Sequence, residues 1–339
     1  MKRNVTMREI GHELGVSAVT VSKALGGKDG VSDAVRSRIV KKAQEMGYNY
    51  SAKASREGRS YDVGVLMADC FLGENEFYAS LYKKLVQQLA EAGCYAILEI
   101  LTEEDERELR VPGMVQSGKV DAVIILGQLG RDYLRMITQC DVALVFLDFY
   151  DEYAGADAVV SDSVYGAYRL TNHLVKMGHS KIGFVGEVRA TSSIMDRYLG
   201  FYKSMMQNEL PIRPEWVLPD RDGRSHLIDI PLPKELPTAF VCNCDRVASS
   251  LVRQLQLAGL RVPEDVSVVG FDDFLIATLC SPPLTTFKVD QECMAKAAVE
   301  SVLSKLDGHP KQNGRIVIGG RMIYRDSVAD LRREGAETR

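Results

Sequence analysis

The first 47 residues place their apolar side chains at helical spacing in three separate groups. The groups are Met7, Ile10 and Leu14, then Val21, Ala24 and Leu25, then Val35, Ile39, Ala43 and Met46. Such a stripe, with members three or four residues apart, is typical of a short amphipathic helix that buries one face. We therefore expect three helices around a small common core.

Polar residues and a glycine mark where these helices begin and end. Thr6 followed by Glu9 forms a capping box before the first helix, and Ser17 and Ser32 cap the second and third. Gly15 supplies the positive φ that a sharp turn between helices needs. Two helices joined by a tight turn can place one helix in the major groove of DNA, although a three-helix bundle without a ligand shows the same pattern.

From Asp62 onward, short runs of Val, Ile and Leu alternate with amphipathic segments. Strands are expected at 63–67, 96–100, 122–126, 142–147, 182–185, 239–242 and 266–271, and helices at 77–92, 163–176, 193–208, 245–258 and 292–306. This alternation predicts βαβ units and parallel sheets in two lobes that divide near residue 160. The chain is thus expected to have an all-α helix-turn-helix head at 1–48, a linker at 49–61 and an α/β body at 62–339.

Charge separates the head from the body. Residues 1–60 contain 12 Lys and Arg against 6 Asp and Glu, whereas the whole chain has a formal net charge of −4. A cationic head on an anionic body is typical of a DNA-binding domain, because binding neutralises phosphates and releases counterions. Double-stranded DNA is therefore the expected partner of the head, and the acidic body is not expected to bind nucleic acid by itself.

Composition gives no sign of a membrane, a metal or a cofactor. No apolar run approaches the length of a membrane span, and Met1-Lys-Arg leads into polar helix signals without a signal-peptide core. The odd number of cysteines, seven, favours reduced thiols in the cytoplasm. Cys242-Asn-Cys244 lacks the spacing of a metal site, and the five histidines form no ligand motif.

No motif of an enzyme is present. The chain lacks a glycine-rich dinucleotide fingerprint, a phosphate loop and a nucleophile elbow. The glycine-rich stretch 26–30 joins two expected helices of the head, so it is interpreted as a turn. Two alternatives stay open: an enzyme of doubly wound fold, which requires turnover of a substrate by the body, and a solute-binding protein, which requires export.

Several short motifs follow one another along the whole chain. They are Val16-Ser17-x-x-Thr20-Val21-Ser22-Lys23, Gly47-Tyr48, Val63-Gly64-Val65-Leu66, Asn75-x-Phe77-Tyr78, Val120-Asp121-Ala122-Val123, Gly178-His179-x-Lys181-Ile182, Arg197-x-x-Gly200-Phe201, Pro237-Thr-Ala239, Val262-Pro263-x-Asp265-Val-Ser267-Val-Val-Gly270-Phe-Asp272-Asp273 and Pro283-Leu-Thr-Thr286. In this order they resemble the lactose-repressor/galactose-repressor family of bacterial transcription regulators.

The resemblance implies a repressor that forms a dimer and binds a pseudo-palindromic operator with its two heads. It also implies a two-lobed, periplasmic-binding-protein-like body with crossovers near 290–320 and a carbohydrate-like small-molecule effector in the cleft. Effector binding would change operator affinity, but induction and corepression use the same scaffold, so the sign is left open. A homodimer without a C-terminal coiled coil is expected, because residues 331–339 contain no heptad seam.

By the same resemblance, Ala18, Val19 and Lys23 enter the major groove. Ala18 and Val19 offer only apolar contacts, which suit thymine methyl groups, whereas Lys23 can donate to guanine O6 and N7. Helix packing is the alternative for Val19, and a phosphate contact is the alternative for Lys23. The hydroxyl groups expected to bind phosphates and fix the register are those of Thr6, Ser17, Thr20 and Ser22.

The linker departs from the family pattern. The family usually has Pro-Asn and then Ala-Arg-x-Leu, whose leucine wedges into the minor groove; here Tyr50 and Ser51 replace the first pair and no leucine is present. Lys53 and Arg56 keep the segment basic, so an electrostatic contact with the minor groove is still expected. We expect weaker operator bending than in typical relatives, which a bending assay measures.

Eight residues of the body are expected to line the effector site. Arg197 matches the family arginine that binds effector hydroxyl or carboxylate groups, with a surface arginine as the alternative. Asp272 and Asp148 each follow a strand and can accept from hydroxyls, whereas Asp273 is expected to cap the following helix. The remaining candidates are Phe77 and Tyr78, which would stack on the effector, and Ser193, Cys244 and Gln291. Cys244 stands where the family favours Asn, and a core cysteine is the alternative there.

Overall fold

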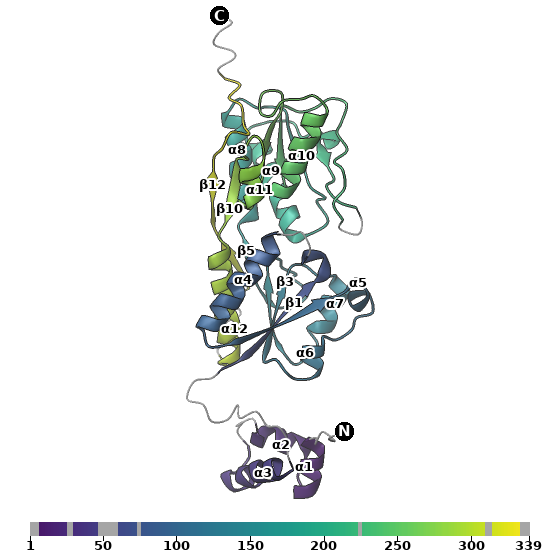
Figure 1. Ribbon diagram of the computed structural model, residues 1–339, viewed down its shortest axis with the longest axis vertical. Helices are drawn as coiled ribbons and strands as arrows, with labels where there is room; N and C mark the ends of the chain where they lie inside the picture. Colours follow the sequence, from purple (N-terminus) through teal and green to yellow (C-terminus); the bar gives the residue numbers. More distant parts are fainter. Residues whose placement is uncertain are drawn as a thin grey trace, which may run out of the picture. The chain divides into compact units, whose positions relative to one another are not determined.

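The computed structural model describes residues 7–25, 30–46, 60–72, 76–222, 226–308 and 314–332 (Figure 1). The chain divides into two compact units, residues 1–61 and residues 62–339. Each unit has its own hydrophobic core, as expected for independently folding domains.

The described part of the first unit consists of three helices, α1 (Met7–Leu14), α2 (Ala18–Leu25) and α3 (Asp33–Glu45). Their apolar stripes meet in one core, and the fully buried members are Ile10, Val21, Ala24, Leu25, Ile39 and Ala43. Gly15 has a φ of 65°, and the Ser17 Oγ accepts from the Thr20 amide at 3.0 Å. The three helices, the turn and the cap of α2 are therefore as the sequence predicts; Thr6 lies outside the described residues.

The first lobe of the body is a six-stranded parallel sheet in the order β11-β5-β4-β3-β1-β2. Its strands are β1 (Asp62–Ala68), β2 (Tyr95–Leu101), β3 (Ala122–Leu126), β4 (Ala143–Leu147), β5 (Asp157–Ser161) and β11 (Arg315–Ile318). The helices of this lobe are α4 (Glu76–Glu91), α5 (Glu103–Arg107), α6 (Gly113–Gln116), α7 (Arg131–Ile137) and α12 (Gln291–Leu306), with the 3₁₀ turn η1 (Asp69–Phe71).

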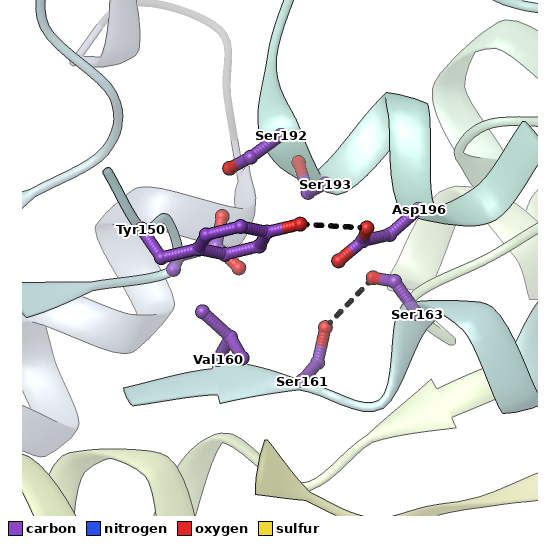
Figure 2. A pocket seen from close by; sticks show the side chains of 8 residues that line it. Tyr150, Val160, Ser161, Ser163, Ser192, Ser193 and Asp196 are labelled. Carbon is purple, nitrogen blue, oxygen red and sulfur yellow. Dashed lines mark hydrogen bonds between the residues drawn. The ribbon is translucent and has the colours of Figure 1, made fainter. Parts of the chain in front are cut away.

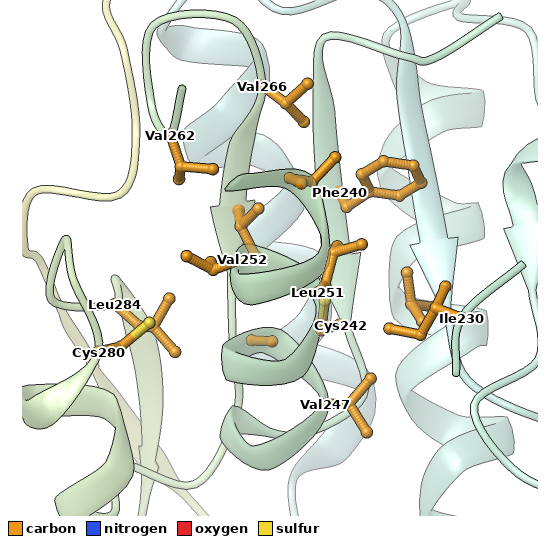
Figure 3. Packing of buried hydrophobic residues seen from close by; sticks show 14 of the residues in the cluster. Ile230, Phe240, Cys242, Val247, Leu251, Val252, Val262, Val266, Cys280 and Leu284 are labelled. Carbon is orange, nitrogen blue, oxygen red and sulfur yellow. The ribbon is translucent and has the colours of Figure 1, made fainter. Parts of the chain in front are cut away.

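The second lobe is a four-stranded parallel sheet in the order β7-β6-β8-β9. Its elements are β6 (Ile182–Val185), β7 (Val217–Leu218), β8 (Ala239–Cys242), β9 (Ser267–Val269), α8 (Ser163–Lys176), α9 (Ser192–Gln207), α10 (Asp245–Leu257), α11 (Leu275–Leu279) and η2 (Pro214–Trp216). Figure 3 shows the apolar face of α10, with Val247, Leu251 and Val252, packed against β8 and its neighbours.

The chain passes between the lobes at three places. These are the connections β5 to α8, β10 (Thr286–Val289) to α12, and β11 to β12 (Gly320–Ile323), and β10 pairs with β12 in an antiparallel ribbon. Strands β5, β7, β10, β11 and β12 were not expected from the sequence. Each is either two residues long or has a charged or polar residue among its apolar ones, so it gives a weaker strand signal than β3 or β8.

Helices α8 and α9 cross at Gly200. A Cβ there would overlap the Val164 carbonyl oxygen and would lie 2.8 Å from the Tyr168 amide nitrogen. Because both neighbours are backbone atoms, Gly200→Ala is expected to force the helices apart and to lower the free energy of unfolding by about 1–3 kcal/mol. Urea unfolding of the full chain measures this. Leu199→Ala, at an exposed position of the same helix, should change it much less.

In the residues that the structure describes, no helix combines the length and apolar character needed to cross a membrane.

Candidate functional site

A small pocket lies between the lobes at the carboxyl ends of the strands (Figure 2). Residues of both lobes line it: Asp148, Tyr150, Val160, Ser161, Ser163, Ser192, Ser193 and Asp196. Almost none of this space can hold even a water-sized molecule, whereas ligand pockets usually have volumes of roughly 300–1,000 Å³. Entry of a sugar-sized molecule therefore requires the lobes to separate further.

Asp148 is the buried carboxylate of the first lobe. It follows β4, is 5% exposed and has a φ of 72°, a backbone conformation that few non-glycine residues adopt. Its Oδ2 accepts from the Tyr78 hydroxyl at 3.0 Å, whereas its Oδ1 is buried and has no hydrogen-bond partner in the ranges that the structure describes. Burial raises the pKa of Asp148 to about 6, against the opposing effects of Arg197 and Tyr78. The unpartnered oxygen can accept a hydrogen bond from a bound molecule.

Arg197 and Asp272 form a buried ion pair in the second lobe, and both are nearly inaccessible to solvent. Arg197 Nη1 donates to the Asn243 carbonyl oxygen at 2.6 Å, and Nη2 lies 3.4 Å from Asp272 Oδ1. The guanidinium carbon lies 4.1 Å from the centre of the Phe271 ring, and Nε is buried without a partner. With Asp148 Oδ1, the site thus offers a donor and an acceptor that no group in the described part of the chain uses.

Asp272 is held in an unusual environment. Its φ is 114°, and burial raises its pKa well above the ordinary value although Arg197 opposes this shift. Like Asp148, it therefore combines a strained backbone with a carboxylate whose charge is costly. Such features concentrate at binding sites, where a fixed geometry outweighs its cost in stability.

Aromatic side chains form one wall beside the carboxylates. Phe77 and Tyr78 of α4 are buried, and the Phe77 ring meets Phe274 of the other lobe edge to face at 5.7 Å. Tyr78 also contacts Phe71, with ring centres 4.5 Å apart. These two predicted residues thus lie at the boundary of the lobes, next to Asp148.

Gln291 starts α12, and its amide links that helix to α4. Its Nε2 donates to the Phe77 carbonyl oxygen at 3.0 Å, and its Oε1 accepts from the Ser80 hydroxyl at 2.8 Å. The structure therefore uses this amide to join two helices of one lobe. Its role toward an effector stays a prediction.

Ser193 and Cys244 lie at the starts of two helices of the second lobe. Ser193 lines the pocket, and its hydroxyl lies 3.0 Å from the Thr191 hydroxyl. Cys244 is the N-cap of α10 and makes no side-chain capping hydrogen bond. Burial raises the pKa of Cys244 to about 12, so the thiol is protonated at neutral pH.

Two hydrogen bonds that the sequence analysis missed join the lobes. The Tyr150 hydroxyl donates to Asp196 Oδ1 at 2.9 Å (Figure 2), and the Ser192 amide donates to Gln128 Oε1 at 2.7 Å. Arg315 stacks over the Tyr150 ring at 4.6 Å. Any motion that separates the lobes here breaks these bonds, so they bias the body toward the closed arrangement.

Asp273 does not cap α11, contrary to the expectation from the sequence. Its oxygens pair with Lys288 at 3.0 Å and with Arg325 at 2.6 Å. The carboxylate that accepts from the Phe274 amide, at 3.0 Å, is Asp245. Sequence adjacency was misleading because the positive φ of Asp273, 63°, occurs where the chain turns after β9.

Asp245 leads to a prediction about pH. It is fully buried, accepts from the Thr286 hydroxyl at 2.6 Å, and burial raises its pKa to about 7. The folded state therefore holds a proton that the unfolded chain releases above pH 4, so this group's contribution to stability is lost as the pH rises from about 4 through 7. Relative to wild type, Asp245→Asn should gain about 2–4 kcal/mol between pH 5 and pH 8, measured by urea unfolding.

Asp265→Asn is the matched control for this pH effect. Arg261 holds the pKa of Asp265 at about 2, so its contribution is lost only in strong acid and the variant should run parallel to wild type between pH 5 and pH 8. Burial lowers the pKa of His179, so the contribution of His179 to stability rises with pH, opposite to that of Asp245. The informative quantity is therefore the difference between each variant and wild type, not the wild-type curve itself. A pH-independent difference for Asp245→Asn would contradict the assignment.

The head presents one face of α2 to solvent. Val19 is 65% exposed, which excludes helix packing as its role, and Lys23 lies one turn later and is also exposed. The Ser17 hydroxyl lies 2.8 Å from that of Thr20 in addition to capping the helix. Ala18 and Ser22 belong to α2, but their side chains, like Lys53 and Arg56 of the linker, lie outside what the structure describes.

Within the described ranges, no His, Cys, Asp and Glu side chains group together in a way that could hold a metal ion, and all seven cysteines are free thiols.

Two family models match the chain. The model described as periplasmic binding protein-like domain matches residues 171–328, and the model described as bacterial regulatory proteins, lacI family, matches residues 6–51. The first match covers most of the second lobe, and the second covers the three helices of the head.

Relatives and solved structures extend the similarity to nearly the whole chain. The HTH-type transcriptional repressor PurR of Aliivibrio salmonicida is 26% identical over 335 residues, which cover 96% of this chain and 99% of that protein. The structure of the transcriptional regulator CelR–cellobiose complex matches with a TM-score of 0.68 and 23% identity, covering 96% of this chain and 100% of the other. The lac repressor dimer bound to operator and the anti-inducer ONPF matches with a TM-score of 0.66 and 21% identity over the same shares.

At these identities the two solved structures show a shared fold, and the family models assign the head and the second lobe. The expectation from the sequence motifs is thereby confirmed. The chain belongs to the lacI family of bacterial regulatory proteins, which consists of DNA-binding transcriptional regulators and not of enzymes.

Proposed function

We propose that the chain is a repressor that binds a pseudo-palindromic operator as a homodimer and is controlled by a small molecule held between its two lobes. The observation that carries this proposal is a pair of buried polar atoms, one in each lobe: Asp148 lines the pocket, and Arg197 follows the lining residue Asp196 on α9. Asp148 Oδ1 and Arg197 Nε are both buried, and neither has a hydrogen-bond partner among the described residues. A buried polar group without a partner is costly, and a ligand that bonds to both removes that cost.

The chemistry of the buried residues around Asp148, at the boundary of the lobes, favours a molecule with several hydroxyl groups. The two carboxylates, Asp148 and Asp272, accept hydrogen bonds, Arg197 donates, and Phe77 and Tyr78 provide an apolar wall. This combination of acceptors and aromatic surface suits a carbohydrate-like ligand. The cellobiose bound to CelR belongs to that class of ligand. The name of the PurR relative does not identify a ligand of this chain.

Control of the head follows from a shift between two arrangements of the lobes. In the closed arrangement, the Tyr150–Asp196 and Ser192–Gln128 hydrogen bonds are intact. A ligand changes operator affinity only as far as it binds one arrangement more tightly than the other. The sign of that change, induction or corepression, is set by the arrangement that the operator-bound dimer prefers.

Two measurements on the full chain test this function. Selection from random double-stranded DNA should yield a two-fold related sequence. A panel of sugars, sugar phosphates, nucleosides and purines should then contain one class that raises the unfolding temperature and changes affinity for the selected operator. Asp148→Asn should lose both responses, and Arg253→Gln, an exposed change on α10, should keep them. Failure to select any two-fold sequence would contradict the proposal.

A dimer has a definite mass. Light scattering of the proposed dimer should give twice the chain mass of 37.6 kDa. A mass near four chains would contradict the dimer.

A further inference from the structure

Arg221 is a second arginine at the ligand-binding edge of the second lobe, and no expectation from the sequence includes it. It follows β7 and donates hydrogen bonds to the preceding residue, Asp220. Its Nη2 donates to Oδ2 at 2.7 Å, and its Nε donates to both carboxylate oxygens at 3.1 Å. Its side chain is 15% exposed. Burial alone would lower the pKa of Arg221, but Asp220 more than offsets this and the pKa is raised.

Asp220 is a rigid support for this arginine. It is 1% exposed and also accepts from the Glu187 amide at 2.7 Å and from Asn243 Nδ2 at 2.8 Å. The Asn243 carbonyl oxygen in turn accepts from Arg197 at 2.6 Å. One buried network at the ends of β6, β7 and β8 therefore fixes both arginines relative to each other.

Arg221 lies near groups of both lobes. Cys244, at the start of α10, and Tyr78, on α4 of the other lobe, are both close enough to act electrostatically on its guanidinium group. The amino end of the 13-residue helix α10 lies at the same strand edge and adds positive potential. Among the described residues, no acceptor takes Arg221 Nη1, so one edge of its guanidinium fork is available to a ligand.

The strand order separates two kinds of chemistry along the cleft. Arg221 follows β7 at one edge of the sheet β7-β6-β8-β9, whereas Asp272 follows β9 at the other edge. The carboxylates, Asp272 and Asp148, thus define an acceptor end, and Arg221 defines a donor end with a positive charge. A molecule that satisfies both ends carries hydroxyl groups at one side and acceptor oxygens at the other.

We propose that the effector carries an oxyanion, a phosphate ester or a carboxylate, that Arg221 binds while the effector's hydroxyl groups bind near Asp148 and Arg197. This inference rests on the proposed function and adds the ligand's charge to it. A planar guanidinium fork held by a carboxylate matches oxyanion geometry, and charge-assisted hydrogen bonds are stronger than neutral ones. Loss of this contact should weaken binding of the anion by about 10- to 100-fold.

The test uses simple anions with the full-length protein, because they isolate the Arg221 contact from the rest of the ligand. Unfolding temperature is measured against inorganic phosphate, acetate and chloride at equal ionic strength. The proteins compared are wild type, Arg221→Gln, Arg221→Lys, the double variant Asp220→Asn/Arg221→Gln and the control Arg253→Gln. The double variant removes both charges, so it avoids the unpaired buried carboxylate that can unfold Arg221→Gln.

We expect saturable stabilisation of wild type and Arg253→Gln by phosphate or acetate beyond that by chloride. Arg221→Lys should keep part of it, and the double variant should lose it. Stronger stabilisation by phosphate would indicate a phosphate ester, and stronger stabilisation by acetate would indicate a carboxylate. Equal shifts in all proteins, the general salt effect, would overturn the inference, and so would the absence of any shift beyond chloride.

A further outcome separates this inference from the proposed function. A neutral sugar that changes operator affinity equally in wild type and in the double variant, but not in Asp148→Asn, would overturn the anionic effector and leave the regulatory function standing.

Discussion

Replacing Arg197 with methionine is expected to reduce effector affinity more than about 100-fold and to lower the free energy of unfolding by about 3 kcal/mol at pH 8. The affinity falls because the variant loses the buried donor Nε and the group that orients Asp272. The stability falls because the Asp272 carboxylate keeps its burial but loses its cation. Calorimetric titration with the compound selected by the thermal panel, and urea unfolding, measure the two effects.

The pH dependence of this variant identifies the cause. Arg197 opposes the rise in the pKa of Asp272, so its removal raises that pKa further. A carboxyl group whose pKa is raised by folding binds a proton more tightly in the folded state, so it increases the free energy of unfolding as the pH falls. The loss of stability in Arg197→Met should therefore shrink as the pH falls from 8 to 5.

The double variant Arg197→Met/Asp272→Asn is the matched control. It should recover most of the stability at pH 8, because no unpaired buried charge is left, but it should not recover effector binding. Selected operator DNA should still bind to both variants, because Arg197 lies in a different compact unit from the head. An effector affinity within threefold of wild type in Arg197→Met would contradict the assignment of the site.

The fold was predictable where the sequence has a long helical period or a compact apolar run. The helix α8 and the strands β3, β6 and β8 have the expected bounds, because each is bordered by turn residues and buried on a regular pattern. The ribbon of β10 and β12 was not expected: β10 is nearly all buried and β12 alternates over only four residues. Pairing of segments 30 residues apart is a tertiary property that such short patterns do not encode.

The site was predictable in part for the same reason. The rule that ligands bind beyond the carboxyl ends of parallel strands points to Asp148 and Asp272, since each follows a strand with a clear apolar run. It missed Arg221 because β7 has only two residues and gives no strand signal. It missed Asp196 because a lone acid beside Arg197 resembles an exposed helix residue, and only the fold brings Tyr150 to it.

The head leads to the second large prediction: Lys23→Gln should weaken operator binding by about 10- to 100-fold. Lys23 and Val19 are four residues apart on α2, and both side chains are exposed, so they share one solvent-facing side of the second helix. In helix-turn-helix proteins the second helix lies in the major groove. A lysine on that face contributes about 1–3 kcal/mol through a base contact or a phosphate contact.

Salt and sequence separate the two contacts of Lys23. A phosphate contact releases about one counterion, so Lys23→Gln should reduce the slope of log affinity against log salt by about 1 and weaken all sequences alike. A base contact should instead relax the preference at one operator position, measured with single-base variants of the selected site. Lys42→Gln is the control, because Lys42 pairs with Glu13 on the head and should change affinity less than threefold. Equal losses in Lys23→Gln and Lys42→Gln would show that only the net charge of the head matters, and would remove α2 as the recognition helix.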